Sequence, residues 1–226
     1  MPRGTKTKEP ILPQVRGKEL RPVSPVALRD DDLLEEFSLK GIDVTGGIAR
    51  DVRFLVGRIE RSRFDQTKFI QGKLVDVVIE NSHFSNADWG KTNFERVSIG
   101  NSKLTGFRAI ESRWKEIIVK ESKADLSLFI LAKFKNVTFE DCIFSDADFQ
   151  ECEMENVRFY KCDLTSASFL GAKLKNVDFR GSKIEKIGIN PEQFRGITIE
   201  PLQASYLIGT TGAKVMWLDD EEPNRS

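Results

Sequence analysis

The sequence predicts an all-β solenoid in which the chain turns a corner every five residues. Every fifth residue from Leu34 to Ile199 is apolar, which makes 34 positions in succession. Segments 20 residues apart also align without gaps, as 134–139, 154–159 and 174–179 do. A period of five fits neither an α-helix, with about 3.6 residues per turn, nor a flat strand, whose side chains alternate. Four sides of five residues instead close a square coil of 20 residues.

Residues 1–25 are predicted to form a disordered basic arm. They contain five of the eight prolines and six Lys or Arg against two Glu. Such a composition cannot bury enough apolar surface to fold by itself. The segment has no apolar stretch of the secretory kind, so we expect a cytoplasmic protein.

Residues 26–199 are predicted to form the solenoid, of about eight coils. The position two residues before each five-spaced residue is mostly small or β-branched, so each side buries one large and one small side chain. Phe37 and Phe107 are large residues at this small position. No proline occurs between Val26 and Asn190, as continuous backbone ladders require. A ladder of stacked amides is predicted at one corner, formed by Asn136, Asn156 and Asn176.

Residues 200–218 are predicted to cap the end of the solenoid, and residues 219–226 to form an acidic tail. Pro201 gives the start signal of a short helix that extends to Thr210. A solenoid needs such a cap because its last coil exposes unpaired backbone and apolar core.

Several repeats carry a specific motif: Ser-Asn-Ala87-Asp-Trp89, Ser-Asp-Ala147-Asp-Phe149 and Thr-Ser-Ala167-Ser-Phe169. They resemble the unit of the pentapeptide-repeat family, A-(D/N)-L-x-x with a central Leu or Phe. The resemblance covers about Leu34 to Ile199. It implies a right-handed quadrilateral parallel β-helix with a short C-terminal capping helix. It also raises the possibility of DNA mimicry, since some members of that family act as DNA mimics that bind type II topoisomerases.

The residues indicate no enzyme, metal site or cofactor. The chain has one histidine, His83, at an outward position, and no nucleophile motif. Cys142 and Cys162 lie one coil apart in one inward column, and Cys152 has no partner in its column. We expect buried free thiols, with a Cys142–Cys162 disulfide as the alternative. No apolar stretch approaches the roughly 20 residues of a membrane span, and the zero net charge argues against direct nucleic-acid binding.

Two surface features are candidates for partner binding, an apolar cluster and a pair of basic stripes. An apolar cluster occupies outward positions of neighbouring coils: Ile110, Leu126, Leu128, Ile130 and Leu131. Basic residues stack in two stripes on opposite faces, one formed by Arg53, Lys73, Arg113 and Lys133, the other by Arg63, Lys103 and Lys123 around His83. An acidic girdle surrounds one coil, from Glu140 to Glu155.

These features favour a non-enzymatic scaffold that binds an unknown protein partner. The alternative is a DNA mimic that modulates a type II topoisomerase and protects it from quinolones. Mimicry needs an acidic surface, but residues 54–199 hold 23 Lys or Arg against 21 Asp or Glu.

The C-terminal end is also predicted to form a homodimer, because a short helix can cover a coil with only one face. The apolar residues left over would then meet a second copy: Leu202, Tyr206, Leu207 and Ile208, followed by Val215, Met216, Trp217 and Leu218. The alternative is a monomer in which 215–218 fold back along the chain's own solenoid.

Overall fold

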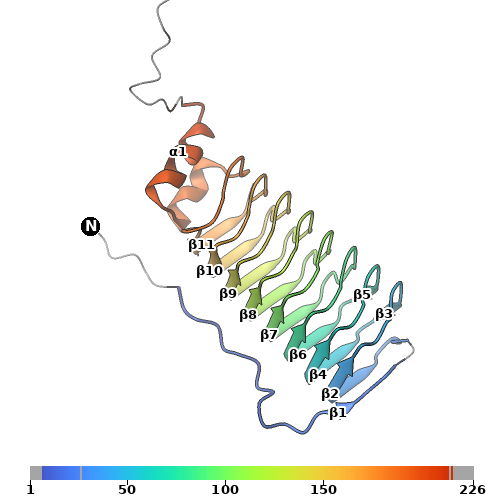
Figure 1. The fold of residues 1–226 in the computed structure, drawn as a ribbon. Coiled ribbons are helices and arrows are strands. Elements are labelled where there is room, and N and C mark those ends of the chain that lie inside the picture. The colour runs from blue at the N-terminus through green and yellow to red at the C-terminus, as the bar shows by residue number, and fades with distance from the viewer. Residues whose placement is uncertain (1–6, 26, 214, 216–226) are drawn as a thin grey trace, which may run out of the picture.

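Strands 20 residues apart stack in parallel register along the whole molecule (Figure 1). The computed structural model describes residues 7–25, 27–213 and 215. They form a parallel β-solenoid of about nine turns that ends in short helices. The main sheet has ten strands in the order β1-β2-β4-β6-β7-β8-β9-β10-β11-β12. Their bounds are β1 Arg21–Pro22, β2 Leu33–Lys40, β4 Arg53–Glu60, β6 Lys73–Glu80, β7 Asn93–Gly100, β8 Arg113–Lys120, β9 Lys133–Glu140, β10 Glu153–Tyr160, β11 Lys173–Asp178 and β12 Ile197–Thr198.

The remaining elements are short. Strands β3 (Ile48–Arg50) and β5 (Lys68–Ile70) form a second parallel pair. A 3₁₀-helix, η1 (Pro191–Gly196), and the helix α1 (Pro201–Gly209) follow the last full coil. The predicted all-β solenoid with a short C-terminal helix is therefore confirmed.

Each corner is made by one residue in the left-handed region. In the coil that starts at residue 132, these residues are Asn136, Asp141, Asp146 and Glu151, with φ between 51° and 56°. We call residues 132–135 the first face, 137–140 the second, 142–145 the third and 147–150 the fourth, and their equivalents 20 residues away take the same names. The predicted amide ladder is confirmed at the corner between the first and second faces. Asn176 Nδ2 donates to Asn156 Oδ1 (2.8 Å), and Asn156 Nδ2 donates to Asn136 Oδ1 (3.0 Å).

The five-spaced residues form the core. Their rings stack from coil to coil, as Phe139 and Phe159 do with centroids 4.9 Å apart and planes at 17°. All but three of the 34 are buried. The exceptions, Leu174, Phe194 and Ile199, are only partly buried. They lie where η1 and α1 replace the next coil, so no complete layer of side chains covers them.

Phe37 shows how a large residue fits at the small position. It is fully buried and pairs in register with Gly57 of the next coil. A Cβ atom on Gly57 would lie 2.3 Å from a carbon of the Phe37 ring. Glycine at residue 57 therefore provides the space that Phe37 occupies.

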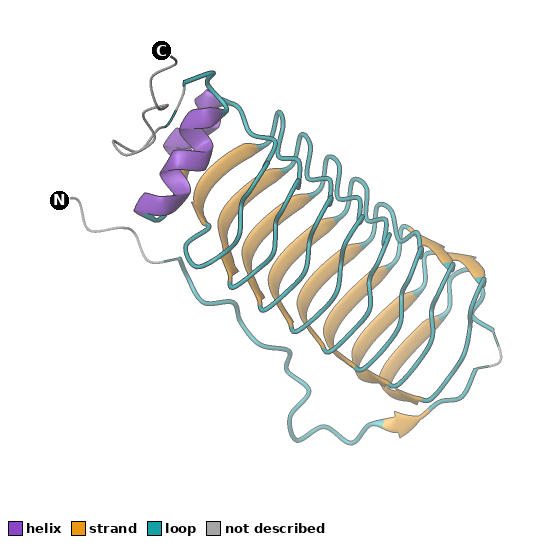
Figure 2. Ribbon diagram, turned by 45° about the horizontal axis from the view of Figure 1, so that its top comes forward, coloured by secondary structure: helices purple, strands orange, loops and turns teal. Residues whose placement is uncertain are grey.

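The disordered arm predicted for residues 1–25 is wrong for residues 7–25. This segment runs along the outside of the solenoid from the α1 end to β1, which pairs with β2 (Figures 1 and 2). Val15 is only 3% exposed, and Pro10 is also buried. Composition failed here because the arm builds no core of its own and uses a surface that the solenoid supplies.

Two glutamines close the last coil. Gln193 Nε2, at the start of η1, donates to the carbonyls of Phe169 (2.6 Å) and Ala172 (2.7 Å). Gln203 Nε2, at the start of α1, donates in the same way to Phe179 and Ser182 (both 2.7 Å). The Phe169 and Phe179 carbonyls also accept from the amides of Ala172 (3.0 Å) and Ser182 (3.1 Å), so the glutamines add a second donor there. The glutamines also supply donors to the Ala172 and Ser182 carbonyls, and a buried carbonyl left without a donor would cost about 1–3 kcal/mol.

Candidate interaction surfaces

The fourth face carries the predicted apolar cluster. Leu128 and Ile130 point outward from it in one coil, and Ile110 lies one coil before Ile130. Leu126 and Leu131 stand at the two corners of the same coil, where they are 56% and 46% exposed. The structure thus brings all five residues together on one side of the solenoid.

The cluster extends further than the sequence reading proposed. Ile70 and Leu170 lie in the same outward column as Ile110 and Ile130, with the buried Gly90 between Ile70 and Ile110. Every twentieth residue from Ile70 to Leu170 is uncharged, with Gly90 and Gln150 as the two positions that are not aliphatic. The sequence alone therefore contains the pattern that extends the cluster. We call the whole set the apolar stripe: Ile70, Ile110, Leu126, Leu128, Ile130, Leu131 and Leu170.

Two leucines of the apolar stripe have an unfavourable backbone. Leu126 and Leu131 have φ of 58° and 59°, a region that costs an L-residue about 1–2 kcal/mol. Among the corners of the described chain, aliphatic side chains occur only at these two positions and at Val56. Neither the backbone nor contact with water favours an exposed leucine here.

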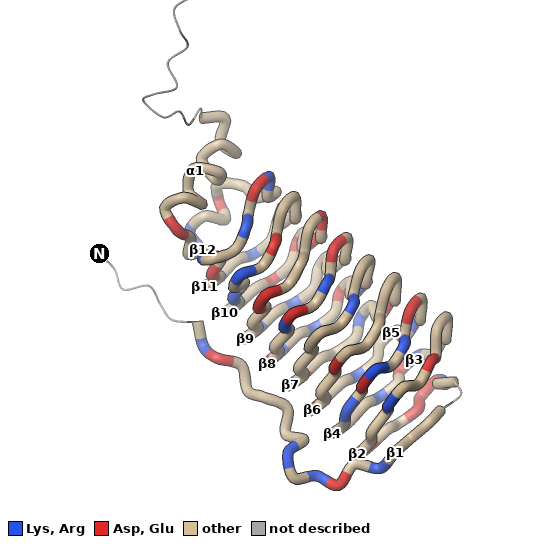
Figure 3. Tube along the Cα trace, viewed as in Figure 1, with Lys and Arg blue, Asp and Glu red and all other residues tan. Residues whose placement is uncertain are grey.

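The predicted basic stripes stack as expected in register, but several members are neutralised. In the β-ladder of the first face, Arg53 lies directly beside Lys73, and Arg113 lies beside Lys133. On the third face, Lys103 lies beside Lys123. Arg63 forms ion pairs with Asp43 and Asp65, and Lys123 with Asp125. Figure 3 shows charges of both signs interspersed along the solenoid. Each stripe is therefore a surface of mixed charge, on which some of the basic side chains form ion pairs with carboxylates.

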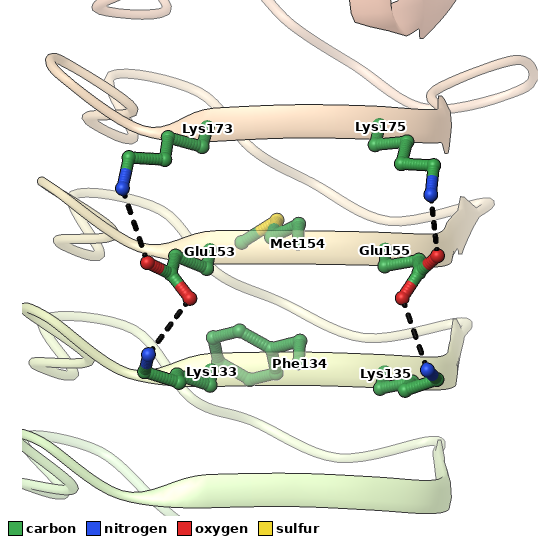
Figure 4. A pocket seen from close by; sticks show the side chains of 8 residues that line it. All are labelled: Lys133, Phe134, Lys135, Glu153, Met154, Glu155, Lys173 and Lys175. Atoms are coloured by element: carbon green, nitrogen blue, oxygen red, sulfur yellow. Dashed lines mark hydrogen bonds and ion pairs between the residues drawn. The ribbon is translucent and has the colours of Figure 1, made fainter.

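Ion-pair ladders join the acidic girdle to the neighbouring coils. On the first face, Glu153 bridges Lys133 (2.8 Å) and Lys173 (3.1 Å), and Glu155 bridges Lys135 and Lys175 in the same way (Figure 4). The ladders flank a shallow depression over Phe134 and Met154. The lysines lower the pKa of both carboxyl groups, first through hydrogen bonds and then through their charge. The two carboxylates beside this depression thus already form ion pairs with lysines of the neighbouring coils.

The cysteines are three buried free thiols. Cys142 Sγ donates to the Glu140 carbonyl (3.2 Å), and Cys162 Sγ to the carbonyls of Phe139 and Tyr160 (both 3.5 Å). The neighbouring Cys162 lowers the pKa of Cys142. Burial raises the pKa of Cys152, whose Sγ donates to the Phe129 carbonyl (2.8 Å).

His83 is exposed on the third face. In the described residues no three His, Cys, Asp or Glu gather as metal ligands would, and no helix there is long and apolar enough to cross a bilayer.

The C-terminal helix has the two-sided character that the sequence predicts. Leu207 is buried against the last coil, while Leu202, Tyr206 and Ile208 are exposed. Val215 is exposed too, and Met216, Trp217 and Leu218 lie outside the described residues.

Comparison with known proteins gives one family match and several similar folds. Residues 132–207 match the family model described as pentapeptide repeat region, and no curated protein matches the sequence. Full-length QnrB1, a plasmid-mediated fluoroquinolone resistance protein, is 16% identical, with 83% of this chain and 100% of that chain covered and a TM-score of 0.29. Rfr23, a pentapeptide repeat protein from the cyanobacterium Cyanothece 51142, is 13% identical (76% and 86% covered, TM-score 0.16). The tailspike protein gp49 of Acinetobacter baumannii bacteriophage Fri1, a capsular polysaccharide depolymerase, is 9% identical (78% and 45% covered, TM-score 0.40).

Proposed function

Because this chain is a pentapeptide-repeat protein, we propose that it acts as a non-enzymatic scaffold that binds a partner protein through the apolar stripe. Solenoids of this family are generally non-catalytic. The repeated coil supplies a rigid rod, and function then depends on the outward residues, which the fold leaves free to vary.

Leu126 and Leu131 are the observation that carries the proposal. Corners elsewhere in the described chain are mostly Asn, Asp, Gln, Glu, Lys, Arg or Gly. Leucine at an exposed left-handed corner makes the free protein less stable, so a contact that covers it would explain its presence. The apolar stripe around these leucines offers a partner an apolar surface that is widest in one coil, where Leu126, Leu128, Ile130 and Leu131 lie together.

The test replaces both leucines by a residue that suits the corner. The L126N/L131N protein should be as stable as the wild type or up to about 1 kcal/mol more stable, because Asn tolerates the left-handed region. In affinity capture from the native cell with quantitative mass spectrometry, it should recover at least about tenfold less of the specific partner, as the loss of two apolar anchors implies. The matched control, E111N/E151N, changes two corners of the same edge and should retain the partner. Equal recovery by both variants would contradict the proposal.

The alternative function, a DNA mimic acting on a type II topoisomerase, has weaker support. The acidic girdle would have to present a row of free carboxylates, but Glu140, Glu153 and Glu155 pair with lysines of adjacent coils. We therefore expect no protection of gyrase supercoiling from a quinolone by the purified protein. Protection at an equimolar ratio would establish the alternative and overturn our ranking.

We further propose a homodimer through the exposed side of α1. A two-fold contact would cover Leu202, Tyr206 and Ile208 of both copies at once. Light scattering at micromolar concentration should give twice the chain mass of 25.7 kDa, and L202E/Y206E should give a monomer with unchanged circular dichroism. A full-length protein that scatters as a monomer would rule the dimer out.

A further inference from the structure

We propose that the second face, with its corner to the first face, is a binding site for a proline-containing peptide, and that residues 7–16, which begin to turn at Gln14, occupy it as an intramolecular ligand. The site lies on a different face from the apolar stripe. The proposal therefore stands or falls independently of the scaffold function.

Two carboxylates recognise the backbone of the arm. The amide nitrogen of Ile11 donates to Glu116 Oε2 (2.8 Å), and that of Gln14 donates to Asp76 Oδ1 (2.9 Å). Both acidic residues occupy the same corner column, two coils apart, and are 5% and 7% exposed. Buried carboxylates that accept hydrogen bonds from main-chain amides are a feature of peptide recognition. They bind the backbone of the peptide whatever its side chains are.

The spacing of the carboxylates selects one backbone conformation. Two coils separate them by about 9.6 Å, at a ladder step of about 4.8 Å. A polyproline II segment advances about 3.1 Å per residue with about three residues per turn, so residues i and i+3 point the same way about 9.3 Å apart. Ile11 and Gln14 have this spacing, and so do Pro10 and Pro13. The corner column thus matches an extended proline-rich chain that lies along the solenoid axis.

The carboxylates are held in place by the solenoid itself. Arg96 donates two hydrogen bonds to Asp76, from Nε (2.8 Å) and Nη2 (2.7 Å). Asn136 Nδ2 donates to Glu116 Oε1, and the amide ladder in turn orients Asn136. Each carboxylate therefore keeps its orientation, as a preorganised site requires. Glu116 keeps Oε2 for the peptide, while Asp76 Oδ1 accepts from both Arg96 Nε and the amide of Gln14.

One outward column of the second face is made of small and apolar side chains: Val78, Ser98, Ile118 and Thr138, all half-buried. The other outward column holds the charged Glu80, Lys120 and Glu140, together with the buried Gly100. Towards the C-terminal end the first column becomes charged, and there Glu9 lies in one depression with Arg158 and Arg180. Val15 is buried yet contributes nothing to the interior core. The outer surface of the solenoid must therefore cover it.

The arm is attached to this site as a ligand on a tether. Residues 16–19 are exposed, and Gly17 has a φ of 79° in the turn that leads to β1. Such a tether gives the arm an effective concentration in the millimolar range, so a free peptide of the same kind competes poorly until the arm is released.

The test uses the full chain and a labelled peptide of residues 7–20. Val15→Glu should release the arm, which trypsin will report by faster cleavage after the exposed Arg16 and Lys18. The V15E protein should then bind the wild-type peptide at least about tenfold more tightly than the wild-type protein does, because the tethered competitor is gone. Glu19→Ala, at an exposed position of the same segment, keeps both cleavage sites and is the matched control for the release.

Face variants identify the site. Adding D76G/E116G to V15E should abolish peptide binding, because glycine suits the left-handed corner and removes the accepting oxygen. Adding the matched corner changes E121G/D146G should leave binding intact, with folding checked by circular dichroism. Unchanged trypsin cleavage in V15E would show that Val15 does not hold the arm, and equal binding to wild type and V15E would show that the arm does not compete. Each of these results, or a released V15E protein that binds no peptide, would overturn the proposal.

Discussion

Replacing Phe144 by Ala is expected to lower the free energy of unfolding by about 3–5 kcal/mol, as truncation of a fully buried aromatic residue does. Phe144 is 1% exposed and contacts rings in its own coil and the next. Its centroid lies 4.9 Å from that of Phe139, 5.7 Å from that of Phe149 and 6.1 Å from that of Phe159. The stacked backbone restricts collapse around the cavity, so the upper part of this range applies.

Urea denaturation followed by circular dichroism measures the change. The adjacent Ile143→Ala is the control, because Ile143 points outward and is 41% exposed; it should cost no more than about 0.5 kcal/mol. A Phe144→Ala protein that loses less than about 1 kcal/mol would mean that residue 144 is not enclosed in the solenoid.

Gly57→Ala is expected to destabilise the protein by about 1–3 kcal/mol through overpacking. The added methyl group would meet three carbons of the Phe37 ring at 2.3–2.6 Å, and the enclosed ring has no free space to move into. Combination with Phe37→Ala should remove the clash, so the double variant should be more stable than the sum of the single losses predicts.

A double-mutant cycle on the four proteins isolates this coupling, which should reach about 1 kcal/mol or more. Gly209→Ala, in α1, is the matched control because nothing lies within 4 Å of the added atom. Strict additivity of Gly57→Ala and Phe37→Ala would show that the two residues do not compete for the same space.

The core could be predicted because the solenoid repeats the same environment at every coil. The interior accepts only apolar side chains at every fifth position, and the resulting signal from Leu34 to Ile199 is stronger than any single motif. The prediction weakened where repetition ends. Leu174, Phe194 and Ile199 continue the pattern, but helical turns that the period does not describe cover them incompletely.

The arm could not be predicted from its composition. Its position depends on main-chain donors at Ile11 and Gln14, which no side-chain pattern reveals, and on acceptors more than 60 residues away. The solenoid held an indirect signal, since Val78 and Ile118 are apolar at outward positions of the second face. The period of 20 residues stacks the basic side chains, but the sequence analysis stopped short of the carboxylates that pair with them. Asp43 beside Arg63 and Glu153 beside Lys133 continue the same columns, while Asp65 pairs with Arg63 from a neighbouring column.

The glutamine closures at η1 and α1 make the end of the solenoid independent of its length. Every coil offers equivalent carbonyls at 20-residue intervals, so Gln193 and Gln203 would meet the same acceptors after fewer or more coils. An in-frame gene duplication of one coil would lengthen the rod by about 4.8 Å and leave both ends intact. A shift by one residue would instead turn charged side chains inward. Insertion of whole coils is therefore expected to change the length of the rod and keep its core, while insertion of a single residue is expected to disrupt the core.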